Sequence, residues 1–285
     1  MAGDRSTLRA TLSRVFRLEN RRREIRRGTL ERIRSFASAV LGNQRDLTVY
    51  LPPGYGERSD LRYPVLYMQD GQNLFDPERA FIPGQHWRLA EAADEAIAAR
   101  TAKPVIIVGI DNTGASRIDE YTPTIDKMRK VGGRATDYAR FLLDEVKPAV
   151  DERFLSLTNG PNTAIGGSSL GGLIALYLAL TRPDVFSAVA AMSPSVWWDE
   201  RHILAAVDGF SAAHRPRVWL DIGGREGREA LENTRLLRDR LVARGWGEGL
   251  HYFEDRRGDH SERAWARRAR AMLEHLFPPA PTETV

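Results

Sequence analysis

Residues 166–172 read Gly-Gly-Ser-Ser-Leu-Gly-Gly and contain a G-x-S-x-G pentad, the pattern of a nucleophile elbow. An elbow places its serine on a sharp, strained turn between a buried strand and a helix. The apolar residues 162–165 and the apolar run 170–180 are typical of that strand and helix. Because glycines two positions before and after it leave room where strand and helix cross, Ser169, and not Ser168, is the predicted nucleophile. Taken alone, the pentad is equally compatible with a turn that binds nothing.

Two later loops carry the remaining groups of a catalytic triad. In hydrolases built on this elbow, the serine is followed along the chain by an acid and then by a histidine, each after a strand. A predicted strand at 217–222 precedes a loop with Glu226, and a predicted last strand at 250–254 precedes a polar loop with His260. The order of the chain therefore predicts Glu226 as the acid and His260 as the base.

Other residues compete for these two roles. The remaining five histidines are less suitable, because they lie in or beside helical segments or inside a strand: His86, His202, His214, His275 and His251. Three acids are too close to His260 in sequence to reach its far nitrogen easily: Glu254, Asp255 and Asp259. Asp221, near the end of the strand before Glu226, stays open as the alternative acid.

Composition is that of an ordinary enzyme domain. The chain has 285 residues and no Pro/Ser-rich linker, so we expect a single core. It has no cysteine, which excludes disulfides and thiolate metal sites. No apolar run approaches the roughly 18 residues of a membrane span. Residues 1–27 lack the apolar segment and cleavage site of a secretory signal, and a cytoplasmic location is the expectation.

The net charge of +4 is weak evidence for a nucleic-acid partner. Almost all of the cations are arginines, and they form two clusters, in residues 14–27 and 256–270. The second is interleaved with Glu and Trp, as on a solvated helix face with local ion pairs. The first predicts a basic extension that is solvated or packs on the body, with a partner or an anionic surface as alternatives. We expect no nucleic-acid partner and no membrane span, and a homo-oligomer stays open.

The order of the apolar segments indicates an α/β fold. Strand-like segments alternate with helical ones, which favours a mostly parallel central sheet with helices on both faces. The expected strands before and after the elbow are 30–39, 46–51, 63–69, 104–110 and 188–192, and the expected helices include 88–99 and 137–150. The first two strands are predicted to form an antiparallel pair.

Several motifs together resemble the putative-esterase family of α/β-hydrolases, closest to its cytosolic enterochelin (siderophore) esterase-like branch. They are Tyr50 to Tyr55 (YLPPGY), Leu66 to Phe75 (LYMQDGQNLF), Gly109 to Asn112 (GIDN), residues 166–172, Ser193 to Trp198 (SPSVWW) and His260 to Trp265 (HSERAW). The resemblance covers about residues 28–278. It implies an esterase domain there, after a basic extension at 1–27 that matches no accessory domain and before a tail at 279–285.

The resemblance implies a serine esterase that acts on a small-molecule ester of siderophore, aromatic or short-chain type. His260 takes the proton of Ser169, Glu226 supports the imidazolium, and water resolves an acyl-enzyme. Backbone amides of Leu170 and of Gly71 or Gln72 are the expected oxyanion hole. No metal or organic cofactor is expected. An acyltransferase and an idle scaffold that binds a ligand or partner are the alternatives.

Four side chains are candidates for substrate contacts. Trp197 and Trp198 follow the strand after the elbow and form an aromatic wall or simply pack. Arg117 and Tyr121 follow the Asp111-Asn112 loop and are candidates to bind an acidic or catecholate group. The alternative for Arg117 is an exposed ion pair with the neighbouring acids at 119 and 120.

Overall fold

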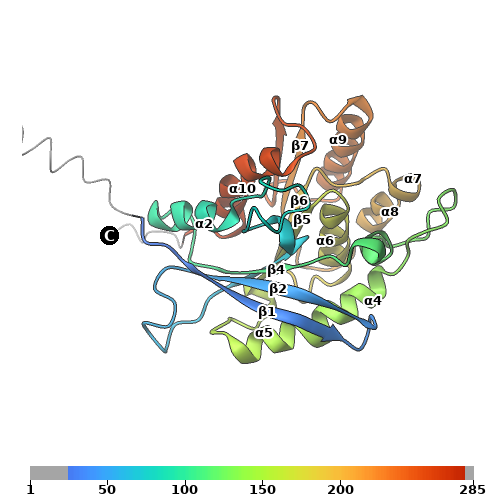
Figure 1. Ribbon diagram of the computed structural model, residues 1–285. Coiled ribbons are helices and arrows are strands. Elements are labelled where there is room, and N and C mark those ends of the chain that lie inside the picture. The colour runs from blue at the N-terminus through green and yellow to red at the C-terminus, as the bar shows by residue number, and fades with distance from the viewer. Residues whose placement is uncertain (1–24, 280–285) are drawn as a thin grey trace, which may run out of the picture.

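The apolar runs of the chain form one mixed sheet in the computed structural model, which describes residues 25–279 (Figure 1). Its strands, within that range, follow the order β1-β2-β4-β3-β5-β6-β7-β8. They are β1 (Thr29–Ser38), β2 (Asn43–Leu51), β3 (Val65–Gln69), β4 (Ile106–Ile110), β5 (Thr163–Ser168), β6 (Ala188–Met192), β7 (Arg217–Gly223) and β8 (Leu250–Asp255). The β3, β4, β5 and β6 strands are buried along their whole length, as expected for parallel strands covered on both faces.

The direction of the strands confirms the expected α/β class. β1 pairs antiparallel with β2, and β2 pairs antiparallel with β4. All the other pairs, from β4 through β3, β5, β6 and β7 to β8, are parallel. The predicted opening antiparallel pair is therefore present at one edge of a mostly parallel sheet of the α/β-hydrolase type.

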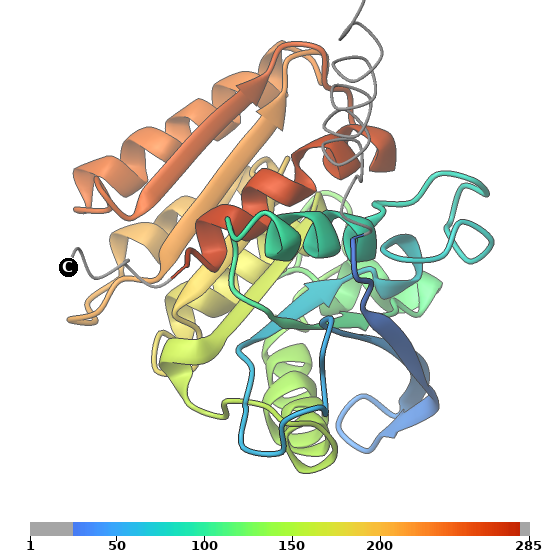
Figure 2. The same ribbon diagram turned by 90° about the vertical axis from the view of Figure 1, so that its left-hand side faces the viewer.

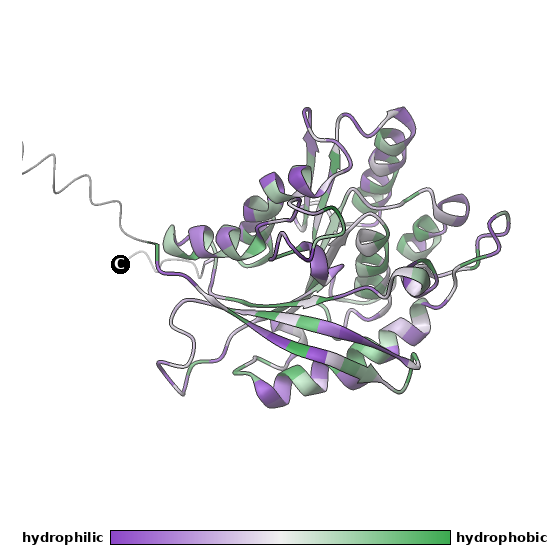
Figure 3. Ribbon diagram, in the orientation of Figure 1, coloured by the Kyte–Doolittle hydropathy of each residue, from purple (hydrophilic) through white to green (hydrophobic). Residues whose placement is uncertain are grey.

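Helices cover both faces of this sheet (Figure 2). One face is covered by α2 (Leu89–Ala98) and α10 (Glu262–Leu276), whose apolar side chains pack on those of β3, β4 and β6. The other face is covered by α4 (Ala135–Arg140), α5 (Lys147–Arg153), α6 (Leu170–Thr181), α8 (Ile203–Asp208) and α9 (Arg228–Ala243). Figure 3 shows that α6 is hydrophobic along its length, as its central position requires.

One predicted helix is less regular than expected. The segment predicted as a helix at 137–150 runs from α4 to α5 through a π-helical stretch, η3 (Phe141–Val146). Hydrophobic periodicity detects the buried face of such a segment but not the extra residue that a π turn takes up.

Parallel strands bring the loops after β3, β5, β6, β7 and β8 to one edge of the sheet, because the carboxyl ends of such strands point the same way. The predicted catalytic groups all lie in these loops. The basic extension and the tail fall almost wholly outside the described residues, so the division at 28 and 278 stays a prediction. No helix between residues 25 and 279 is long and apolar enough to span a membrane.

Candidate active site

Ser169 lies at a strained turn between β5 and α6. Its backbone angles are φ 56° and ψ −124°, and positive φ is uncommon for a residue with a side chain. Its amide donates a hydrogen bond to the carbonyl of Met192 in β6 (3.0 Å), and its Oγ lies 3.3 Å from Ser195 Oγ. Ser168, in contrast, is buried inside β5. Of the two serines, Ser169 is the one whose hydroxyl lies outside the strand.

The glycines around Ser169 are required by space. A Cβ on Gly167 would lie 2.7 Å from the backbone of Gly171, and a Cβ on Gly171 would lie 3.0 Å from Gln69 Cβ. Any side chain at either position would force apart β5, α6 and the end of β3.

Glu226 and His260 are joined by a short contact. Glu226 Oε2 lies 2.6 Å from His260 Nδ1, and the Glu226 side chain is buried whereas the imidazole is half exposed. An ionised carboxylate only accepts hydrogen bonds, so Nδ1 carries the proton and Nε2 is left as a base. Burial opposes ionisation of Glu226, but the hydrogen bonds from His260 and Ser193 hold its pKa below the usual range.

The nucleophile candidate is not bonded to this pair. Among the described residues, Ser195 is the hydrogen-bond partner of Ser169 Oγ, and His260 makes no hydrogen bond to Ser169. Contacts between a catalytic base and its nucleophile often tighten only when substrate binds.

Asp221, the alternative acid, lies inside β7 and is fully buried. Its Oδ2 accepts a hydrogen bond from Trp219 Nε1 (2.7 Å), and its Oδ1 lies 3.1 Å from Arg268 Nη2. Burial raises the pKa of Asp221 to about 6, although Arg268 and Trp219 act in the opposite direction. These partners occupy both of its oxygens, and His260 is not one of them. The geometry therefore favours Glu226 as the acid.

The amides expected to bind an oxyanion belong to two turns at the same edge of the sheet, after β3 and after β5. Leu170 is the first residue of α6, and Gly71 and Gln72 begin the short helix η1 (Gly71–Asn73) after β3. The first amides of a helix have no partner within it. Neither Leu170 N nor Gln72 N donates a hydrogen bond to another described residue. A Cβ on Gly71 would lie 2.4 Å from the backbone of Gly109, so this turn packs tightly on β4.

Arg117 binds Asp70, and neither of its two neighbouring acids. Its Nε and Nη2 each lie 2.7 Å from one oxygen of the Asp70 carboxylate. Asp70 immediately precedes Gly71 and has a left-handed backbone conformation, with φ 57° and ψ 47°. The ion pair therefore holds the turn after β3. The alternative of an ion pair with the acids at 119 and 120 is wrong, because the partner is Asp70, and the expectation that Arg117 contacts substrate stays a prediction.

Tyr121 also contacts the turn after β3. Its side chain is fully buried, and its hydroxyl accepts a hydrogen bond from the Asp70 amide (3.3 Å). A residue without exposed surface cannot contact substrate, so the expectation for Tyr121 is wrong. Asn112 completes the support by donating from Nδ2 to Asp70 Oδ1 (2.7 Å).

The two tryptophans have different surroundings. Trp198 is buried, and its Nε1 donates to the carbonyl of Thr124 (3.0 Å). It therefore packs in the interior, which was the alternative to an aromatic wall. Trp197 is 38% exposed, and the Arg129 guanidinium lies 4.7 Å from the centre of its ring. Only Trp197 is in a position to form an aromatic wall.

A cleft of about 820 Å³ opens beside the Glu226 and His260 pair. Both residues line it, as do Trp197 and Arg129, and this volume is typical of small-molecule sites. Ser169 is not among the residues that line the cleft, but Ser195, whose Oγ lies 3.3 Å from Ser169 Oγ, is one of them. Three cations, Lys127, Arg201 and Arg228, and four acids, Asp126, Asp199, Glu200 and Glu229, also lie around it.

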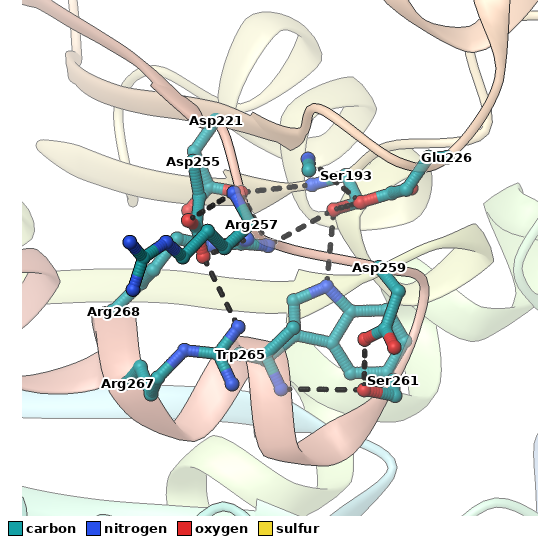
Figure 4. A network of polar contacts seen from close by, with 12 residues as sticks. Ser193, Asp221, Glu226, Asp255, Arg257, Asp259, Ser261, Trp265, Arg267 and Arg268 are labelled. Carbon is teal, nitrogen blue, oxygen red and sulfur yellow. Dashed lines mark hydrogen bonds and ion pairs between the residues drawn. The ribbon is translucent and has the colours of Figure 1, made fainter.

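The sequence analysis missed a polar cluster behind Glu226. Ser193 donates from Oγ to Glu226 Oε1 (2.6 Å) and accepts from two residues of α10, Trp265 and Arg268 (Figure 4). The signal was a serine directly after β6, at the same edge of the sheet as the triad loops. Its partners on α10 were not detectable, because they come from 72 and 75 residues away.

Residues 38–276 match the model of a family described as putative esterases. The chain belongs to this putative esterase family. It is a carboxylic ester hydrolase. The sequence is 28% identical over 232 residues to an uncharacterised protein of Bacillus subtilis, covering 75% of this chain and 84% of that protein.

A further relative and a solved structure are similar to this chain. The iron(III) salmochelin esterase of Escherichia coli is 30% identical over 229 residues, covering 72% of this chain but only 48% of the relative. The crystal structure of the BES protein from Bacillus cereus has the same fold, with a TM-score of 0.71 at 22% identity over 88% of this chain and 95% of that one.

No group of three or more histidine, aspartate or glutamate side chains in the described part of the chain is arranged to hold a metal ion. The expectation of a reaction without metal or cofactor stays a prediction.

Proposed function

We propose that the protein hydrolyses esters through a triad of Ser169, His260 and Glu226 and an acyl-enzyme. The observation that carries the proposal is the 2.6 Å contact between Glu226 Oε2 and His260 Nδ1, at the same edge of the sheet as the strained turn of Ser169. Glu226 fixes the tautomer of His260 that leaves Nε2 free to take the proton of Ser169. The unpartnered amides of Leu170 and Gln72, with Gly71 beside them, are the donors for the oxyanion.

We propose a bulky aromatic ester, of siderophore type, as the substrate. The relative from E. coli is named an iron(III) salmochelin esterase, and the cleft volume of about 820 Å³ lies in the upper part of the range typical of small-molecule sites. Trp197 supplies an aromatic surface beside the triad, and Arg129 stacks on it. An aromatic acyl group that carries negative charge fits these two neighbours.

Labelling of the nucleophile tests the mechanism. A fluorophosphonate should modify one residue per chain, and peptide mass spectrometry should place the adduct on Ser169. Ser169→Ala should lose both labelling and hydrolysis of p-nitrophenyl acetate, whereas the adjacent Ser168→Ala serves as the matched control and keeps a substantial part of each. Activity should persist in EDTA. A folded wild-type chain that takes no label and cleaves no ester would overturn the proposal, and a panel with a ferric siderophore and a feruloyl ester would test the substrate.

A further inference from the structure

Ser193 has an unusual position directly after β6. Its backbone is left-handed, with φ 42°, a conformation that is strained for a residue with a side chain and persists only where the surroundings enforce it. Its amide donates to the carbonyl of Asp221 (2.9 Å) and lies 3.2 Å from Asp221 Oδ1. Ser193 borders the cleft but is only 2% exposed, and its hydroxyl has three protein groups within hydrogen-bond distance.

Three groups surround the Ser193 hydroxyl, and their chemistry fixes its direction (Figure 4). Trp265 Nε1 lies 3.0 Å away and Arg268 Nη2 lies 3.1 Å away, and both can only donate. A hydroxyl oxygen accepts two hydrogen bonds and donates one. Both of its acceptor positions are therefore filled, and its one proton must go to the third neighbour, Glu226 Oε1, at 2.6 Å.

The direction of this hydrogen bond has a consequence for Glu226. Its Oε1 accepts both from Ser193 and from the amide of Gly223 (2.8 Å). With Oε1 filled by two donors, Oε2 is the oxygen left for His260. Because both of these donors face Oε1, any proton on Glu226 would have to lie on Oε2, and hydrogen bonds donated to a carboxylate favour its ionised form.

We infer that Ser193 is a positioning residue of the triad, which holds Glu226 ionised and rotated so that Oε2 faces His260 Nδ1. The inference rests on the proposed function of Ser169, His260 and Glu226. Ser193 touches neither the reacting atoms nor His260, so it acts only through the carboxylate.

The cluster behind Ser193 makes this arrangement rigid. Arg268 is buried in α10, pairs with Asp221 in β7 at 3.1 Å, and lies 3.5 Å from Asp255 at the end of β8. His260 thus lies on one side of Glu226, and Ser193 with Arg268 and its two aspartates lies on the other. The two carboxylates compensate the positive charge of the Arg268 guanidinium. Arg268 can therefore donate a hydrogen bond to Ser193 without placing an uncompensated charge beside the triad.

Two substitutions separate the hydroxyl from the backbone strain. Ser193→Ala and Ser193→Gly both remove the donor to Glu226, but only glycine relieves the left-handed φ. A hydrogen bond to a charged group is strong enough that each variant should lower kcat for p-nitrophenyl acetate by about 10- to 100-fold. KM should stay within about twofold, since no substrate contact is lost. Ser35, a second serine with left-handed φ (49°), lies exposed in β1, and the Ser35→Ala and Ser35→Gly pair is the matched control with unchanged kcat.

A spectroscopic readout completes the test. The His260 Nδ1 proton should give a strongly downfield proton resonance in the wild type, assigned by its loss in His260→Ala, and it should move upfield in both Ser193 variants. Wild-type kcat and an unmoved resonance in Ser193→Gly would overturn the inference, because strain alone would then explain Ser193. If the wild type is not labelled at Ser169, the triad itself fails. If it is labelled, and Ser193→Gly is labelled equally fast, only the positioning role fails.

Discussion

The two sides of the elbow each have an aspartate and arginine ion pair, but the pairs differ in depth. On one side, after β3, Asp70 and Arg117 are 8% and 25% exposed. On the other side, in β7, Asp221 and Arg268 are 0% and 2% exposed. The shallow pair belongs to the turn that carries the proposed oxyanion amides. The deep pair is linked to the proposed acid, Glu226, through Ser193, which hydrogen-bonds to both Glu226 and Arg268.

The buried pair also distinguishes Asp221 from Glu226, the proposed acid of the triad. Asp221 is close to the end of its strand, as a triad acid would be, yet its two carboxylate oxygens already have Trp219 and Arg268 as partners. Glu226 lies further along, in the loop, where one oxygen is anchored and the other is left for His260. Burial and hydrogen-bond partners, and not position along the strand, are the reasons for proposing Glu226 over Asp221.

Replacing Glu226 and Asp221, each by its amide, is the strongest test of the difference between them. Glu226→Gln would place an amide against His260 Nδ1, which favours the tautomer with a proton on Nε2. We expect kcat for p-nitrophenyl acetate to fall roughly 10³- to 10⁴-fold, as when a triad acid is made neutral. Steady-state kinetics measures this directly.

Asp221→Asn is the matched partner of that experiment. Asparagine has the shape of aspartate but no charge. Because Asp221 affects Glu226 only by way of Ser193, kcat should fall by no more than about tenfold. The reverse result, a crippling Asp221→Asn beside a near-neutral Glu226→Gln, would show that Asp221 is the acid.

Removing Arg268 tests the depth of the second pair. Arg268→Met leaves Asp221 buried without its partner, which should lower the free energy of unfolding by about 3–5 kcal/mol. The pKa of Asp221 is already raised to about 6, and loss of Arg268 raises it further. At pH values between the pKa of Asp221 in the unfolded chain, about 4, and its higher pKa in the folded variant, the folded chain binds a proton at Asp221 that the unfolded chain has released. Lowering the pH through this range therefore stabilises the folded variant. Its deficit should be smaller at about pH 5 than at about pH 8.

Urea unfolding of Arg268→Met at both pH values measures this, with Arg267→Met as control. Arg267 is the preceding residue of α10 and makes an exposed ion pair with Asp255. Such a pair contributes about 0–1 kcal/mol, so the control should stay near the wild type. Equal losses for the two variants, or a deficit independent of pH, would contradict the buried pair.

The sequence was sufficient for the features that depend on local pattern. The elbow, the alternation of strands and helices, and the loops with Glu226 and His260 each follow from apolar runs and the residues that end them. The supporting pairs could not be predicted, because Arg117 and Asp70 are 47 residues apart and meet only across the folded sheet. Trp197 and Trp198 show the same limit, since adjacent residues of one type differ in burial only through what packs beside each.

The shallow pair should show the smallest of the three effects and a different balance between stability and activity. Arg117→Met removes two hydrogen bonds from the Asp70 carboxylate, but that carboxylate keeps Asn112 and some contact with water. We expect the free energy of unfolding to fall by about 1–3 kcal/mol. Because the turn with Gly71 and Gln72 loses its anchor, kcat for the neutral substrate p-nitrophenyl acetate should fall about tenfold with KM nearly unchanged. Arg134→Met is the control, since Arg134 is exposed and pairs only with Asp137 one turn along α4. A raised KM with unchanged kcat, strongest for anionic esters, would instead return Arg117 to the substrate, because uniform binding lost from the ground state appears in KM alone.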